Sequence, residues 1–263
     1  MASQQPRFWR DAKMPYVEIR YIEDGHAVRY VPHSHQTWSV GAILSGESSF
    51  LCGDRLHHVN EGDLVMMRPN EVHCCNPVLN SPWSYYMMHI DEQWLSDVLG
   101  VSCLPVTVDA CGDQALFSTF LSLAKGLFSD SCCETKSADL TRWLKALFDQ
   151  VTTQTAHASL TNARLTQIAY YLIEHCDQDE SIDTIAALFG VSASYLNRAF
   201  KKQYHMTPHA FRLNHRVQLG QIALKNGMSI ADVAYQFGFS DQAHFQRIFK
   251  ARVAATPRQY IAD

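Results

Sequence analysis

The sequence predicts an α+β protein with more than one domain, in which a β-rich N-terminal part precedes an all-helical C-terminal part. Two observations predict this class. Short runs of strand-forming residues separated by turns fill residues 15–90, and a short helical unit occurs twice between residues 181 and 263. With 263 residues, 47% of them hydrophobic, the chain is long enough to form two packed cores.

The N-terminal strands are predicted from short runs of apolar and β-branched residues. Turn-forming pairs such as Asp24-Gly25 separate them. Examples of the predicted strands are Tyr16–Ile22, Ala27–His33, Trp38–Leu44, Ser48–Cys52, Asp63–Met67 and Ser84–Ile90. Strands this short, with turns this regular, predict a barrel or a roll of two sheets.

Two amphipathic helices are predicted next, over residues 113–128 and 137–151, because their apolar residues recur at helical spacing. This apolar surface needs a partner, either the flank of the barrel or the same helices of a second subunit. The polar segment 152–159 that follows is typical of a linker. We therefore divide the chain into residues 1–110, a helical segment 111–151, a linker 152–163 and a C-terminal domain 164–263.

The C-terminal domain contains one helical unit twice, over Ser181–Pro208 and Ser229–Pro257. In each copy a first helix ends at a glycine, Gly190 or Gly238, where a left-handed turn is cheap because glycine has no Cβ. A serine follows, Ser192 or Ser240, and serine is a favourable N-cap for a second helix. Each copy therefore has the layout of a helix-turn-helix.

The second helix of each copy has a polar face suited to double-stranded DNA. Arginine, asparagine and glutamine can read base edges in the major groove, whereas lysine mostly contacts phosphate. Residues 181–263 carry ten Lys and Arg against four Asp and Glu, whereas residues 1–160 carry eleven against eighteen. Positive charge thus lies where the repeat is, as a DNA-contacting surface requires. The candidate DNA-binding residues are Ser194, Asn197, Arg198 and Lys201 in the first copy and Gln242, His244, Gln246, Arg247 and Lys250 in the second.

The second copy also carries a specific string. It reads Gly238-Phe239-Ser240-Asp241-Gln242-Ala243-His244-Phe245, followed by Arg247, Phe249-Lys250, Thr256-Pro257 and Tyr260. Over about residues 164–263 the chain resembles the double helix-turn-helix domain of the AraC family of transcription regulators. His205 and Ala254 stand where that family often has glycine. The resemblance implies a cytoplasmic regulator that forms a homodimer, with RNA polymerase as a further partner if it activates transcription.

Two N-terminal segments resemble the two motifs of a cupin. They are Val31-Pro-His-Ser-His35 and the run from Glu61 to His73. Regulators of the AraC type commonly carry such a domain to sense a small-molecule effector. The resemblance therefore implies an N-terminal cupin-like β-barrel with a helical dimerisation segment, joined to an all-α double helix-turn-helix.

His33 and His35 are two residues apart in a predicted strand, so both rings should point to one face, the interior of the barrel. His73 joins them from the second motif. One interpretation is a polar effector pocket lined by these three histidines, with Trp38 and Tyr86 as aromatic walls. In a second interpretation the histidines are structural, satisfied by hydrogen bonds.

A third interpretation is a divalent metal held by His33, His35 and His73, because imidazole suits zinc, iron or manganese. Cupins that bind metal usually place a carboxylate a few residues after the histidine pair, and Ser39 and Val40 stand there instead. No cofactor is therefore assigned with certainty.

Taken together, these features predict an effector-responsive, sequence-specific DNA-binding transcription regulator rather than an enzyme. Two alternatives stay open, namely a metal-binding cupin enzyme fused to a DNA-binding domain, and a constitutive regulator without an effector. The first twenty residues are polar and charged, so neither a signal peptide nor a membrane partner is expected.

Overall fold

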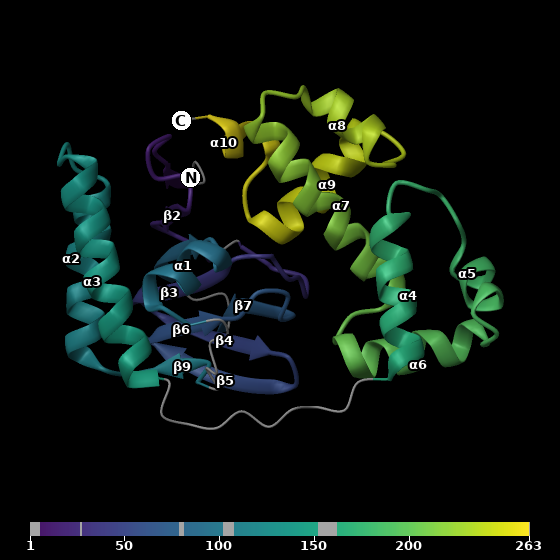
Figure 1. Cartoon of the computed structure of the whole chain (residues 1–263), viewed down its shortest axis with the longest axis horizontal. Coiled ribbons are helices and arrows are strands. Elements are labelled where there is room, and N and C mark those ends of the chain that lie inside the picture. The colour runs from purple at the N-terminus through teal and green to yellow at the C-terminus, as the bar shows by residue number, and fades with distance from the viewer. Residues whose placement is uncertain (1–5, 27, 79–81, 102–107, 152–161, 263) are drawn as a thin grey trace.

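The computed structural model describes residues 6–26, 28–78, 82–101, 108–151 and 162–262. Strands occupy the chain up to residue 111, and helices dominate from there on (Figure 1). The predicted α+β class, with a β-rich N-terminal part and a helical C-terminal part, is therefore confirmed. No helix in the described ranges has the length and apolar character that a bilayer crossing requires.

The β-rich part consists of two antiparallel sheets. The six-stranded sheet has the order β1 (Arg7–Trp9), β2 (Val17–Ile22), β8 (Ser84–Ile90), β3 (Trp38–Ser45), β6 (Leu64–Met67) and β9 (Ala110–Cys111). The three-stranded sheet has the order β5 (Arg55–Asn60), β4 (Glu47–Cys52) and β7 (His73–Pro77). Among the described residues these strands form no single closed barrel. The result is the roll of two sheets, which agrees with a cupin-like architecture.

Two details of the strand prediction are wrong. β1, β5, β7 and β9 are strands outside the runs named from the sequence. The expected strand Ala27–His33 is not formed, since residue 27 lies outside the described residues and 28–33 carries no strand. His33 instead makes one isolated bridge with His73, whose backbone groups exchange hydrogen bonds of 3.0 and 2.8 Å with its own.

The side chains between the two sheets come from alternate positions of each strand. Ile43 of β3, Val65 of β6 and Tyr85 of β8 meet Phe50 and Cys75 of the smaller sheet in one buried cluster. Because successive strand residues point to opposite faces, the intervening residues of the large sheet face outward. The two-residue period thus determines which residues can reach the interior of the roll.

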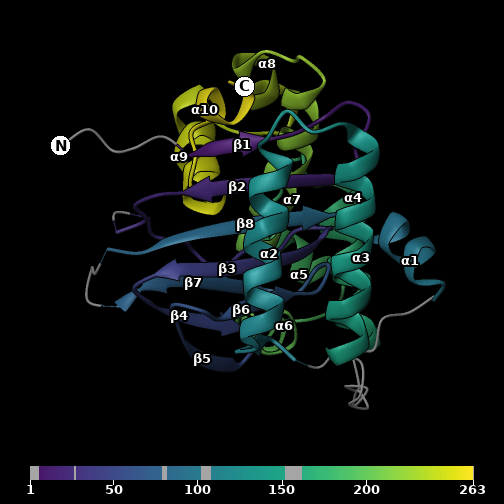
Figure 2. The same ribbon diagram turned by 90° about the vertical axis from the view of Figure 1, so that its left-hand side faces the viewer.

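Two long helices cover the outer face of the large sheet (Figure 2). They are α2 (Gln114–Leu127) and α3 (Cys133–Val151), and α1 (Glu92–Leu99) follows β8 directly. Phe120, Leu144 and Phe148 pack with Trp38 and Met88 of the sheet in a second buried cluster. The apolar bands predicted for these helices therefore face the β-roll of their own chain, which is the first of the two partners considered.

The C-terminal part is entirely helical. It consists of α4 (Ala163–Glu174), α5 (Ile182–Leu188), α6 (Ala193–Tyr204), α7 (Pro208–Lys225), α8 (Ile230–Gln236), α9 (Gln242–Val253) and α10 (Pro257–Ile261). Helices α4 to α6 share one apolar cluster, and α7 to α10 share another. Gly190 and Gly238 follow α5 and α8 with φ of 66° and 70°, the left-handed turns that the sequence predicts.

The N-caps of the two second helices differ. Ser192 caps α6, as predicted, by accepting a hydrogen bond from the backbone N–H of Tyr195. Helix α9 is capped by Asp241 and not by Ser240. The Ser240 hydroxyl lies 3.1 Å from His244 Nδ1 instead, so the second copy begins its helix one residue later than predicted.

The α7–α10 group packs against the β1–β2 edge of the large sheet. Arg10 of the N-terminal part donates to the carbonyl of Tyr260 at 2.7 Å, and Lys225 of α7 pairs with Glu18 at 2.7 Å. Asn214 of α7 donates to the carbonyl of Ser34 at 3.0 Å. These contacts place the second helix-turn-helix directly beside the β-roll (Figure 1).

Candidate functional site

Helices α6 and α9 carry the candidate DNA-binding residues on their outward faces. Both helices bury a phenylalanine in the domain core, Phe200 or Phe249. Their opposite faces are left to solvent, as a base-reading helix requires. The exposed candidates are Ser194, Arg198, Lys201, Gln242, Arg247 and Lys250, whereas Asn197, His244 and Gln246 are half-buried.

Two of the half-buried candidates already have hydrogen-bond partners within their own helix-turn-helix. The amide of Asn197 donates to the carbonyl of Ala193 at 3.0 Å. The ring of His244 lies beside Ser240, as described above. The exposed Arg198 and Arg247 occupy equivalent positions of the two copies and are thus the strongest candidates for base contacts.

Helix α7 determines how far apart the two units lie. Its 18 residues correspond to a length of about 27 Å, at 1.5 Å per residue. Successive major-groove positions on one face of B-DNA are about 34 Å apart. A rigid connection of this length is therefore of the right scale for two helices that enter neighbouring major-groove segments.

Four histidine rings gather at one end of the β-roll. His33 and His35 precede β3, His73 begins β7, and His89 belongs to β8. Ring centroids are 4.5 Å apart for His33 and His73, 4.7 Å for His35 and His73, and 4.9 Å for His35 and His89. The predicted convergence of His33, His35 and His73 is thus present, although neither His33 nor His35 lies in a strand.

Three of these rings are oriented by the backbone. The Nδ1 atoms of His33, His35 and His73 lie 2.9, 3.0 and 2.8 Å from the carbonyl oxygens of Val31, Thr37 and Glu71, respectively. A carbonyl oxygen only accepts, so Nδ1 of each ring carries the proton and Nε2 carries a lone pair. The three rings can therefore offer Nε2 as a hydrogen-bond acceptor.

Burial keeps the whole cluster uncharged. It lowers the pKa of His33, His35 and His89 well below the ordinary histidine value, and neighbouring cationic groups act in the same direction. Burial lowers the pKa of His73 to about 4. At neutral pH the four rings are therefore polar and neutral.

Sequence reasoning missed His89 and placed two aromatic residues wrongly relative to the cluster. The Ser39 hydroxyl lies 2.7 Å from His89 Nδ1 and 3.2 Å from His35 Nε2, so β3 and β8 both contribute to this site. Trp38 and Tyr86 point the other way, where Trp38 contacts Phe148 of α3 and Tyr86 lies near Phe120 of α2. The structure does not bring them together with the histidines, because each is an odd number of residues from an inward-facing neighbour in its strand.

A cavity of about 750 Å³ opens beside the histidines, between the β-roll and the second helix-turn-helix. Its size is within the range of small-molecule sites. Both parts of the chain line it, with Arg20, His33, His35 and His89 from the β-roll and Asn214 and Arg252 from the helices. His73, Trp38 and Tyr86 do not line it.

The metal interpretation fits the histidines by donor type but not by spacing. Neutral imidazoles are suitable ligands. Yet in the part of the chain that the structure describes, the only three potential ligand atoms within 4.8 Å of one another belong to Cys52, Glu71 and Asp109. We therefore assign no metal to the histidines.

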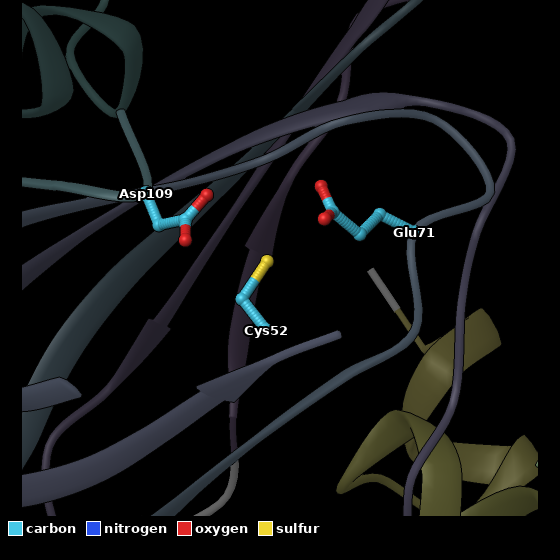
Figure 3. A group of neighbouring side chains, drawn as sticks. All are labelled: Cys52, Glu71 and Asp109. Carbon is cyan, nitrogen blue, oxygen red and sulfur yellow. The ribbon is translucent and has the colours of Figure 1, made fainter. Parts of the chain in front are cut away.

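Cys52, Glu71 and Asp109 lie close together (Figure 3), and arginines bind the two carboxylates. Arg55 donates to Asp109 at 2.5 and 2.9 Å and to Glu71 at 2.9 Å, and Arg68 donates to Glu71 at 2.7 Å. Burial raises the pKa of the Cys52 thiol, so that it stays protonated. Charge-compensated carboxylates beside a neutral thiol are typical of a structural ion-pair network rather than of a metal site.

The fold and these sites define a class of protein, a DNA-binding protein with two helix-turn-helix units and a separate ligand-binding domain. The model of the AraC-like ligand binding domain matches residues 15–173, and that of a helix-turn-helix domain matches residues 141–212 and 185–263. The chain belongs to the AraC family of transcription regulators, with a ligand-binding domain and a DNA-binding domain.

Named relatives agree with this assignment. YbfI of Bacillus subtilis (strain 168), an uncharacterized HTH-type transcriptional regulator, is 26% identical over 88% of this chain and 86% of that protein. MtrA of Neisseria gonorrhoeae, an HTH-type transcriptional regulator, is 34% identical over 37% of this chain and 33% of that protein. RhaS of Enterobacter sp. (strain 638), an HTH-type transcriptional activator, is 30% identical over 37% of this chain and 36% of that protein.

Solved structures show the same fold. ToxT of Vibrio cholerae O395 superimposes with a TM-score of 0.55, covering 98% of this chain and 97% of that one at 12% identity. ToxT from V. cholerae strain SCE256 with a bound unsaturated fatty acid gives a TM-score of 0.56, covering 98% and 95% at 11% identity. At such low identity the likeness concerns the fold alone.

Proposed function

We propose that this regulator reads double-stranded DNA with α6 and α9 at two neighbouring major-groove positions. A small-molecule effector, bound where the β-roll meets the second helix-turn-helix, alters that binding. The observation that carries the proposal is the equivalent placement of exposed Arg198 and Arg247 on the two helices, joined by α7. Because its partner is DNA, we place the protein in the cytoplasm.

Replacing Arg247 with alanine should weaken specific DNA binding without unfolding the protein. The side chain is exposed, so its loss leaves the core intact, and one bidentate base contact is worth about 1–3 kcal/mol of discrimination. Arg198→Ala should weaken binding at the other position. The measurement is the affinity of each variant for an operator selected from random sequences, at fixed salt. Lys202→Ala, an exposed neighbour on α6 outside the proposed contacts, serves as the control. Wild-type affinity in both arginine variants would rule out these roles.

For the effector we favour a polar cavity over a metal centre. His33 and His35 line the cavity. The ring of His73 lies outside the lining and contacts the rings of both. The alternative of a cupin enzyme is disfavoured, because the relatives above are transcription regulators and the histidine donors lack the spacing of a ligand set. That a ToxT structure holds a fatty acid does not identify the effector of this chain.

A homodimer stays a prediction. The apolar faces of α2 and α3 are buried in their own chain, so a dimer through these helices must use their outer faces, which are largely polar. Light scattering of the purified protein tests it, with twice the mass of 29.8 kDa as the expected result. RNA polymerase is a further partner if the protein activates transcription. RhaS is, by its name, a transcriptional activator.

A further inference from the structure

Tyr195 is an exposed aromatic residue near the start of the first base-reading helix. It is the third residue of α6, and 42% of its surface is exposed. Its backbone N–H donates to the hydroxyl of the N-cap Ser192 at 3.2 Å. Among the residues that the structure describes, its side chain has no hydrogen bond and no aromatic contact, and it is not part of the apolar cluster of α4 to α6. The ring is therefore free to pack against a partner.

The position of Tyr195 on α6 is the one at which a partner would be DNA. Tyr195 lies three residues before Arg198, so the two side chains are neighbours on one face of the helix. Leu196 and Phe200 are fully buried and hold the other face in the core. A base-reading helix in the major groove contacts base edges with its N-terminal residues. Tyr195 therefore belongs to the part of α6 that would approach the bases.

The equivalent residue of α9 is fastened in its own turn. His244 lies three residues before Arg247, and its Nδ1 is 3.1 Å from the Ser240 hydroxyl. Its ring also meets Phe239 edge to face, with centroids 5.7 Å apart. Both partners belong to the turn after Gly238, which is one residue longer than the turn after Gly190 in the first copy. The shorter turn leaves the ring of the first copy without such partners.

The amide side chains of the two helices differ in the opposite sense. In α6 the amide of Asn197 is bound to the helix backbone, as described above. In α9 neither Gln242 nor Gln246 has a hydrogen-bond partner in the described part of the chain. A glutamine amide reads adenine through two hydrogen bonds, whereas an aromatic ring offers only apolar surface. The two helices are thus equipped for different bases.

We propose that Tyr195 makes the α6 segment of the operator specific for thymine. Thymine alone presents a methyl group, on C5, in the major groove, and apolar side chains recognise it by contact. Arginine most often reads guanine, so the thymine lies beside the guanine that Arg198 contacts. This inference rests on the proposed function and names the base that one of its two helices selects. Because α9 has no free ring at this position, the two operator segments differ and the operator has a direction.

The test uses the full chain and an operator selected from random DNA by the wild type. Each thymine of the two protected segments is replaced singly by deoxyuridine, which lacks only the C5-methyl group. Affinity at fixed salt is measured for the wild type, Tyr195→Ala, Tyr195→Phe and Tyr170→Ala, and thermal unfolding checks that each variant is folded. Tyr170 is 63% exposed on α4, outside both base-reading helices, and is the control for loss of an exposed ring.

One deoxyuridine in the α6 segment should weaken binding of the wild type and of Tyr170→Ala by about fourfold, which corresponds to one buried methyl group. Tyr195→Ala should bind the thymine and deoxyuridine operators equally. Tyr195→Phe should discriminate as the wild type does, because the ring and not the hydroxyl makes the contact. A new selection with Tyr195→Ala should lose the preference for thymine at that position and keep the neighbouring guanine.

The proposal is overturned if no deoxyuridine in the α6 segment weakens wild-type binding, or if Tyr195→Ala still discriminates. Equal losses in Tyr195→Phe and Tyr195→Ala would also overturn it, since they would assign the contact to the hydroxyl and a phosphate. The wild-type measurements need no substitution, so a variant that does not fold leaves the test intact. Two protected segments without any dependence on the methyl group refute this inference alone. If no operator is selected, the proposed function fails and this inference fails with it.

Discussion

Lowering the pH from 7 to 5 is expected to destabilise the folded protein strongly, because four buried histidines must stay neutral in the fold. Each has a pKa depressed by burial, to about 4 for His73 and well below the ordinary value for the other three. In the unfolded chain histidine titrates near 6.5. Between pH 6.5 and 4 the unfolded state therefore binds more protons than the folded state, and the free energy of unfolding falls as the pH falls.

The expected slope is about 1.4 kcal/mol per pH unit for each such histidine, so His73 alone accounts for about 2 kcal/mol between pH 6.5 and 5. Urea unfolding followed by circular dichroism at pH 7, 6 and 5 measures it. His73→Asn should reduce the slope by about one proton, because the amide can still donate to the carbonyl of Glu71 while no longer titrating. His58→Asn, at an exposed position, is the control. Equal unfolding free energies at pH 7 and 5 would contradict the buried neutral cluster.

Arg216→Met is expected to lower the free energy of unfolding by about 3 kcal/mol or more. Arg216 of α7 is 4% exposed, and its guanidinium donates to the carbonyls of Cys176, Gln178 and Gly238. The first two follow α4, whereas Gly238 forms the turn of the second helix-turn-helix. Removal of the donor leaves three carbonyls without their partner, and it also removes the link between the segment after α4 and the turn of the second helix-turn-helix.

Denaturant unfolding of the variant measures this effect, with exposed Arg258→Met as the matched control. Residual binding to the selected operator should fall together with stability, because the relative position of α6 and α9 depends on α7. A loss below about 0.5 kcal/mol, the usual size of a surface substitution, would show that these hydrogen bonds contribute little.

The sequence predicts the helical part better than the β-rich part. Helix boundaries are signalled locally, and Gly190, Gly238 and Ser192 act as predicted. The error at Ser240 arises because two adjacent residues, Ser240 and Asp241, are both favourable N-caps. Local sequence cannot decide between them, since the choice depends on how the turn packs.

The strand errors have a different cause. β7 contains no β-branched residue, and its pairing with β4 comes from tertiary context. The placement of Trp38 and Tyr86 could have been predicted from the two-residue period. It puts Trp38 on the other face of the sheet from Ser39, and Tyr86 on the other face from His89. Helical repeat and cupin-like motifs do not carry this information, whereas strict counting along β3 and β8 does.

The cavity could not be predicted from sequence. Arg20 and Arg252 are 232 positions apart, and only the docking of α9 on β2 brings them to one site. In the sequence, Arg252 looks like one more cation of a basic domain. Its burial, not its residue type, distinguishes it from the exposed arginines of α6 and α9.

The central claim is that two equivalent helices of one chain read two positions on one DNA. The most direct measurement is a hydroxyl-radical and base-methylation footprint of the wild type, Arg198→Ala and Arg247→Ala on the selected operator. We predict protection of two major-groove segments about 34 Å apart for each chain, with each variant losing its contacts at a different segment. Protection of a single segment per chain, or loss of the same contacts in both variants, would contradict the claim.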